Sequence, residues 1–186
     1  FIFGYDGGPA FPAQAIRAQS GAVWVADRER GLISAQGGDV GSSIQPNGPK
    51  TANTWRMATR GGALYVATGA LAGNWSSTFL KDGVHHFSTG QWGTSDLTTD
   101  PILLGENSFG GAVNDFVSVA VDPDDPMHAW VGTWDDGVIE FRNLQPVEIW
   151  NQTNSCLGVE LNGAEGKVNV AGMNFDLNGN LWMTNA

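Results

Sequence analysis

The chain has 186 residues, of which 41% are hydrophobic, 15% are charged and 26 are glycine, and its formal net charge is −10. This composition is typical of a folded protein with many turns and excludes a disordered chain. The acidic excess disfavours nucleic acid as a partner, because binding to phosphates requires a positive surface, and no apolar run is long enough to span a membrane, so we expect no direct membrane insertion.

Four segments share one pattern, in which a short apolar strand is followed by a tight turn and a second strand centred on an aromatic residue. In chain order the segments are 16–27, 55–69, 117–135 and 171–185. Their aromatic residues are Trp24, Tyr65, Trp130 and Trp182. Apolar positions alternate with period two, and no segment has helical periodicity without an intervening Gly or Pro, so we predict an all-β chain.

Each segment extends to four strands, most clearly in the third, where strands are predicted at 117–121, 129–133, 138–141 and 147–150. Four-stranded sheets that recur roughly every 40–50 residues are typical of propeller blades. We therefore predict a β-propeller of three to four four-stranded antiparallel blades, a partial arc of a larger ring that forms one segment over 1–186. The blades are placed at about 13–50, 53–98, 115–155 and an incomplete 168–186. A β-sandwich is the structural alternative.

Two intervals lie outside this pattern. The polar stretch 94–114 is predicted to be a loop or insertion that lengthens the spacing between the second and third blades. The residues 1–5 form an apolar leading strand that suits the last strand of a preceding blade. Together with the half-blade at the other end, this strand indicates that the chain is a piece of a longer protein.

No motif assigns a catalytic residue, a metal or a cofactor, and we predict none. The segment Asp176–Asn180 matches only the opening of a calcium loop, since Leu181 stands where that loop requires Gly, and a hairpin turn explains it better. The carboxylates of Asp122–Pro126 are similarly explained by a rigid turn. His85 and His86 are adjacent on a strand and point to opposite faces, so they cannot bind one metal.

The connections between the second and third strands carry the candidate binding residues. In a propeller these connections emerge on one face, so the segments 27–30, 69–82 and 133–136 are expected to converge there. They would bring together Trp75, Trp134, Asp27, Arg28, Glu29, Arg30, Asp135 and Asp136. Exposed aromatic faces among hydrogen-bonding groups suit a sugar-binding or protein-binding surface. Loop residues that only cover the ends of the blades are the simpler alternative.

The stretches 130–141 (WVGTWDDGVIEF) and 175–185 (FDLNGNLWMTN) look like the two-component-regulator propeller repeat. Together with 23–33 and 47–69, they resemble in order the corresponding stretches of PorZ-type proteins of type IX secretion systems. The resemblance implies tandem β-propellers in a non-enzymatic protein at the cell surface or in the periplasm of a Gram-negative bacterium. It also implies a role in attaching secreted cargo to an anionic lipopolysaccharide, with a glycan, this lipopolysaccharide or other secretion-system proteins as partners.

Two other functions stay open. One is an oligosaccharide-sensing propeller of a hybrid two-component receptor. The other is a propeller glycoside hydrolase, since 121–133 (VDPDDPMHAWVGT) also resembles the repeats of such enzymes. A hydrolase needs two carboxylates about 5–10 Å apart across a cleft, and such a pair would come from distant segments that spacing alone does not place.

Overall fold

The computed structural model describes residues 4–5, 8–35, 42–44, 46–104, 111–160 and 166–185. Strands make up nearly all of the regular structure in this part, and the one helical turn described there is η1 (Pro101–Leu104), so the all-β prediction is confirmed. Within the described residues, no helix has the length and apolar character that a membrane crossing requires. The chain divides into two compact units, residues 1–48 and 49–186.

The first unit contains one four-stranded antiparallel sheet. Its strands, in spatial order, are β3 (Pro12–Arg17), β4 (Val23–Asp27), β5 (Gly31–Ala35) and β6 (Ser42–Ile44). Before it, β1 (Gly4–Tyr5) pairs with β2 (Gly8–Pro9). The leading strand expected at 1–5 is therefore a member of a two-stranded ribbon, and its first three residues lie outside the described part. Val25 and Ile33 form a small buried core on this sheet.

The second unit contains three sheets, each a simple antiparallel meander. The first consists of β7 (Arg56–Arg60), β8 (Ala63–Ala67), β9 (Val84–Ser88) and β10 (Gln91–Ser95). The second consists of β11 (Phe116–Val121), β12 (His128–Thr133), β13 (Val138–Arg142) and β14 (Gln145–Trp150). The third is the pair β15 (Val170–Phe175) and β16 (Leu181–Asn185).

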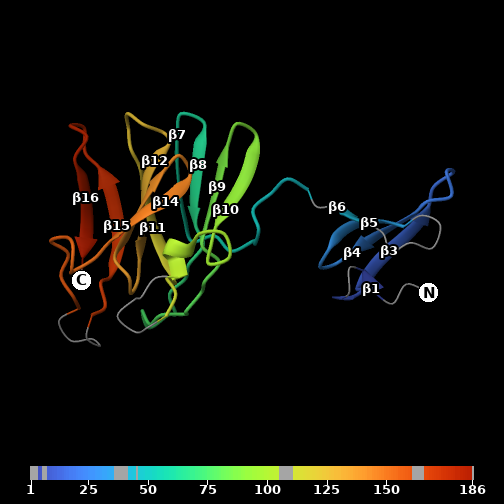
Figure 1. Cartoon of the computed structure of the whole chain (residues 1–186), viewed down its shortest axis with the longest axis horizontal. Helices are drawn as coiled ribbons and strands as arrows, with labels where there is room; N and C mark the ends of the chain where they lie inside the picture. The colour runs from blue at the N-terminus through green and yellow to red at the C-terminus, as the bar shows by residue number, and fades with distance from the viewer. Residues whose placement is uncertain are drawn as a thin grey trace. The chain divides into compact units, whose positions relative to one another are not determined.

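These three sheets are successive blades of a partial β-propeller, the predicted fold, and they lie side by side in Figure 1. The first strand of the middle blade, β11, contacts β7 and β8 of the preceding blade and β15 of the following one. Sheets that pack face to face around an axis bury their apolar faces against one another, and the radial arrangement leaves only short edge strands.

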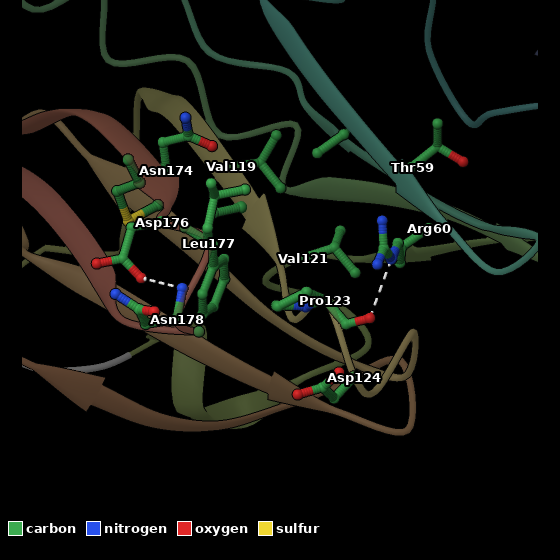
Figure 2. A pocket seen from close by; sticks show the side chains of 15 residues that line it. Thr59, Arg60, Val119, Val121, Pro123, Asp124, Asn174, Asp176, Leu177 and Asn178 are labelled. Atoms are coloured by element: carbon green, nitrogen blue, oxygen red, sulfur yellow. Dashed lines mark hydrogen bonds between the residues drawn. The ribbon is translucent and has the colours of Figure 1, made fainter.

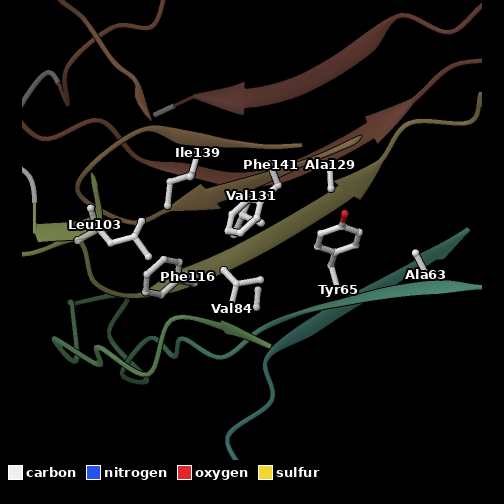
Figure 3. Close-up of a cluster of buried hydrophobic side chains, with 11 residues drawn as sticks. Ala63, Tyr65, Val84, Leu103, Phe116, Ala129, Val131, Ile139 and Phe141 are labelled. Carbon is white, nitrogen blue, oxygen red and sulfur yellow. The ribbon is translucent and has the colours of Figure 1, made fainter. Parts of the chain in front are cut away.

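The main core lies between the blades of the second unit (Figure 3). Tyr65 of β8 and Phe141 of β13 pack edge to face, with ring centroids 6.1 Å apart. Burial raises the pKa of Tyr65 to about 12. Trp130 of β12 contacts Phe175 of β15 across the next blade boundary, with centroids 5.5 Å apart. Tyr65 and Trp130, the aromatic residues at the second-strand position of these two blades, therefore fill the contacts between blades, whereas Trp182 of β16 is 67% exposed.

One blade boundary depends on a glycine. Gly132 lies on β12 where the next blade approaches, and a Cβ at this position would stand 2.3 Å from both the Ser118 Oγ and the Val170 carbonyl oxygen. The Ser118 hydroxyl donates to that same carbonyl at 2.9 Å, which joins the two blades. Any larger side chain would push the blades apart.

The interval 94–114 differs in part from the predicted loop. Thr94 and Ser95 continue β10, and η1 follows, placing Leu103 in the main core. Leu103 lies in the short apolar run 102–104, which is too brief to show a period, so its burial was not detectable from the sequence pattern. Residues 105–110 of this interval lie outside the described part.

Candidate functional site

The connections of the second unit emerge at two ends of the blades. The turns between first and second strands line one hollow of about 640 Å³ beside β7, β11 and β15, and Figure 2 shows this hollow with Arg60, Pro123 and Leu177 around it. The connections 68–83 and 134–137, between second and third strands, lie at the other end of the strands.

At the end of the blades where the turns between first and second strands lie, polar side chains form hydrogen bonds within the turns themselves. The Asp176 carboxylate accepts hydrogen bonds from the Trp182 indole N–H at 2.9 Å and from the backbone N–H groups of Asn178 and Asn180. These bonds hold the pKa of Asp176 below its ordinary range. Gly179 has a φ of 81°, as a tight hairpin turn requires. The hairpin interpretation of this segment is confirmed.

The acidic turn 122–126, between β11 and β12, is stabilised by the same kind of hydrogen bond. Asp122 accepts from the backbone N–H of Asp124, and Asp125 accepts from that of Met127, both at 2.9 Å. In the described residues, no three His, Cys, Asp or Glu side chains gather as metal ligands.

Trp75 stands at the tip of a small hairpin at the opposite end. Leu71 and Ser77 form an isolated antiparallel bridge, and the Trp75 N–H donates to the Ala72 carbonyl oxygen at 2.9 Å. The Trp75 backbone has a φ of 64°, an unusual conformation for a large side chain, and the residue is 69% exposed. Its indole ring packs at a tilt of 33° against that of Trp134, with centroids 6.4 Å apart. The fold thus brings these two predicted site residues together.

A buried carboxylate fixes this connection to the middle blade. Asp115, which directly precedes β11, accepts hydrogen bonds from the hydroxyl and the N–H of Thr78 and from the N–H groups of Phe79 and Leu80, at 2.7–3.0 Å. Its own N–H donates to the Leu80 carbonyl oxygen, and its carbonyl oxygen accepts the Trp134 N–H. One aspartate therefore positions both connections.

Asp135 links three segments at this end. Its carboxylate accepts from the Ser77 hydroxyl at 2.9 Å and from the Lys167 ammonium at 2.6 Å. Asp136 follows it, receives the Asn114 N–H on its carboxylate at 3.4 Å and pairs with Val168 in an isolated parallel bridge. We define the loop face as Trp75, Phe79, Trp134, Asp135 and Lys167, which these contacts bring into one neighbourhood.

The remaining predicted site residues belong to the first unit. Asp27 ends β4 and accepts hydrogen bonds from the backbone N–H groups of Phe11, Glu29 and Arg30 at 2.7–3.1 Å. Burial alone would raise the pKa of Asp27, but these bonds lower it. Arg28 is exposed, and its N–H donates to the Phe11 carbonyl oxygen. A shared site between Asp27, Arg28 and Arg30 and the loop face stays a prediction.

The sequence pattern did not predict a role for three residues at the end of the blades that carries the loop face, Phe79, Asp115 and Lys167. Asp115 and Phe79 come from segments separated by 36 residues, so spacing gave no indication that they touch. Phe79 is 64% exposed with a φ of 58°, and this backbone conformation depends on the Asp115 bonds. The apolar pair formed by Phe79 and Leu80 in this connection was the one available signal.

No protein-family profile and no curated protein sequence matches the chain. Among solved structures, it is similar to PorZ, a bacterial surface component of the type IX secretion system of Porphyromonas gingivalis, with 26% identity and a TM-score of 0.64. The match covers 90% of this chain and 22% of PorZ, so the chain spans about a fifth of the length of that protein. This likeness confirms the resemblance expected from the sequence.

A second solved structure is the extracellular domain of a protein described as a hybrid two-component system of B. thetaiotaomicron. It is 14% identical, has a TM-score of 0.42, and covers 91% of this chain and 19% of its own.

Proposed function

We propose that this chain belongs to a non-enzymatic propeller protein of the bacterial cell surface that, like PorZ, acts in a type IX secretion system. Its part would be to bind a partner through the loop face while secreted cargo is attached to an anionic lipopolysaccharide. The similarity to PorZ over nine-tenths of the chain supports the system, and the contact between the exposed Trp75 and Trp134 supports the surface. That aromatic pair is the observation that carries the proposal.

The chemistry of the loop face favours binding over hydrolysis. Each oxygen of the Asp115 carboxylate accepts two hydrogen bonds, and the two oxygens of Asp135 accept from Ser77 and Lys167. A glycosidase needs a carboxylic acid that can protonate the leaving oxygen and a second carboxylate that faces it across the substrate. Carboxylates that fix loop geometry in this way are poorly suited to either role.

The charge of the chain favours particular partners. With a formal net charge of −10, it would repel a polyanionic glycan at long range. Aromatic faces bind sugar rings and protein side chains by contact, and this attraction does not depend on net charge. Direct contact with lipopolysaccharide through the sugar rings, or docking to another secretion protein, is therefore more favourable than contact with its phosphate groups.

The test is a double variant, Trp75→Ala/Trp134→Ala, whose binding to immobilised anionic lipopolysaccharide and to the detergent-solubilised secretion complex is measured by surface plasmon resonance. If the pair is a binding hot spot, its loss should weaken one of the two interactions by about 2 kcal/mol, or roughly 30-fold in Kd. Leu177→Ala is the matched control, since Leu177 is fully exposed at the opposite end of the blades. Unchanged binding of the double variant to both partners would refute the proposed surface.

A further inference from the structure

A hollow of about 290 Å³ lies beside the pair Trp75 and Trp134, at the end of the blades that carries the loop face. Its lining includes Phe79, Lys81, Asn114, Asp135 and Lys167. A hollow of this size is at the small end of the range for ligand pockets and would hold a single small ring rather than a drug-sized molecule. Asp135 and Lys167 lie on both the hollow and the loop face, so a ligand on the face could extend into it.

Asn114, one of the lining residues, carries a buried polar atom without a partner in the described part of the chain. Asn114 is 4% exposed, and its Oδ1 atom accepts no hydrogen bond in the described part of the chain. Its Nδ2 donates to the Ala112 carbonyl oxygen at 3.3 Å, and its backbone N–H donates to Asp136. The bond from Nδ2 orients the side-chain amide so that Oδ1 is the atom left without a partner. A buried acceptor is normally satisfied by protein or by a bound molecule, so this one points to an O–H or N–H donor from a ligand.

The rest of the lining sets the shape and charge of that ligand. Phe79 presents an exposed apolar ring, on a backbone that Asp115 holds in place. The Lys167–Asp135 ion pair, with its atoms 2.6 Å apart, offers both a cationic donor and an anionic acceptor. Neighbouring hydroxyl groups on one ring can donate to a carboxylate and accept from an ammonium group at once. An apolar ring for contact together with such paired polar groups is typical of a site that binds a sugar.

We infer that this hollow is a subsite for one pyranose ring, which would stack on Phe79 and donate a hydroxyl hydrogen to Asn114 Oδ1. The inference rests on the proposed function and specifies the ligand of the same face as a carbohydrate. Phe79 and Lys81, both in the lining, are exposed.

The inference is tested by titrating the isotope-labelled chain with methyl α-mannopyranoside, methyl β-galactopyranoside and methyl β-glucopyranoside, followed by NMR. At least one of the three should give saturable shifts at Phe79, Asn114 and Lys167. Phe79→Gly keeps the required backbone conformation and removes the ring, and Asn114→Ala removes the acceptor. Each should weaken that sugar by about fivefold or more, as expected for the loss of a ring contact or a hydrogen bond.

Two controls separate the outcomes. Leu177→Ala should bind the sugar with unchanged affinity. Shifts confined to Trp75 and Trp134, or full affinity of the Phe79→Gly variant, would overturn the subsite while leaving the proposed function in place. Absence of saturable shifts with all three glycosides would also overturn the subsite, whereas the proposed function fails only when Trp75→Ala/Trp134→Ala leaves partner binding unchanged.

Discussion

Asp27, Asp115 and Asp176 each hold a connection in the same way, through a carboxylate that accepts backbone N–H groups. Short acidic side chains are suited to this because they reach backbone donors that no strand satisfies. The turn at Asp176 was predictable, since its donors follow within four residues. The role of Asp115 was not, because its donors lie 35–37 residues away and are brought to it by the blade contact.

A fourth carboxylate, Asp96, yields a prediction about pH. Burial alone would raise its pKa, but the Lys50 ammonium and the Thr98 hydroxyl and N–H donate to it and lower the pKa from 3.8 to about 2. A group whose pKa is depressed by folding stabilises the fold above its unfolded pKa, and this contribution disappears as the pH falls through the folded value. Asp96 should therefore stabilise the fold fully at neutral pH and lose its effect between pH 3.8 and about 2.

The measurement compares urea unfolding of the natural chain and of Asp96→Asn across this pH range. The difference in the free energy of unfolding should be constant above about pH 5 and shrink toward pH 2. A difference that does not change down to pH 2 would show that the Lys50 and Thr98 contacts do not act through the charge of Asp96.

At the level of strands, the middle blade of the second unit was the best predicted, with each strand within two residues of its observed bounds. Its turns contain Asp-Pro and Asp-Gly pairs, which end strands sharply. The fourth strand of the sheet in the first unit, β6, has only three residues, so its pattern was weak. Leu103 shows the limit of periodicity, since a single buried residue has no period.

Packing between blades yields a second prediction. Gly132→Ala should destabilise the second unit by about 1–3 kcal/mol, because the added methyl group meets Ser118 and Val170 in a contact without free space. Gly73→Ala is the control, since a Cβ there meets nothing within 4 Å and its backbone is not left-handed. Equilibrium urea unfolding of both variants measures the difference, and equal stabilities would mean that the blades can separate at this point without cost.

At the level of the whole molecule, the repeats predicted a propeller, and the similarity to PorZ agrees with it. The blade count of the full ring was not predictable, because each repeat encodes its own hairpins and contacts with its neighbours, and ring closure depends on small rotations added over all blades. The convergence of Asp27, Arg28 and Arg30 on the loop face depends on the same rotations and stays a prediction.

The division into two units can be tested by expressing them separately. Residues 49–186 contain the main core and should fold alone with one cooperative urea transition. In the described part of residues 1–48 the core cluster consists of two buried hydrophobic residues, and this fragment should be unfolded alone, because chains of about 40 residues rarely bury enough surface. Circular dichroism and NMR dispersion check both results. A folded 1–48 fragment would contradict this argument.

The connection that carries Trp75 and Phe79 is already fastened in the absence of any partner, through the Asp115 carboxylate and the Leu71–Ser77 bridge. A partner would therefore bind a preorganised surface, and this connection would lose little conformational entropy on binding. Association should proceed in one kinetic phase at the ordinary rate for protein complexes, about 10⁵–10⁷ M⁻¹s⁻¹, without a slow isomerisation step. Differences in affinity among ligands would then come from differences in the dissociation rate of each complex.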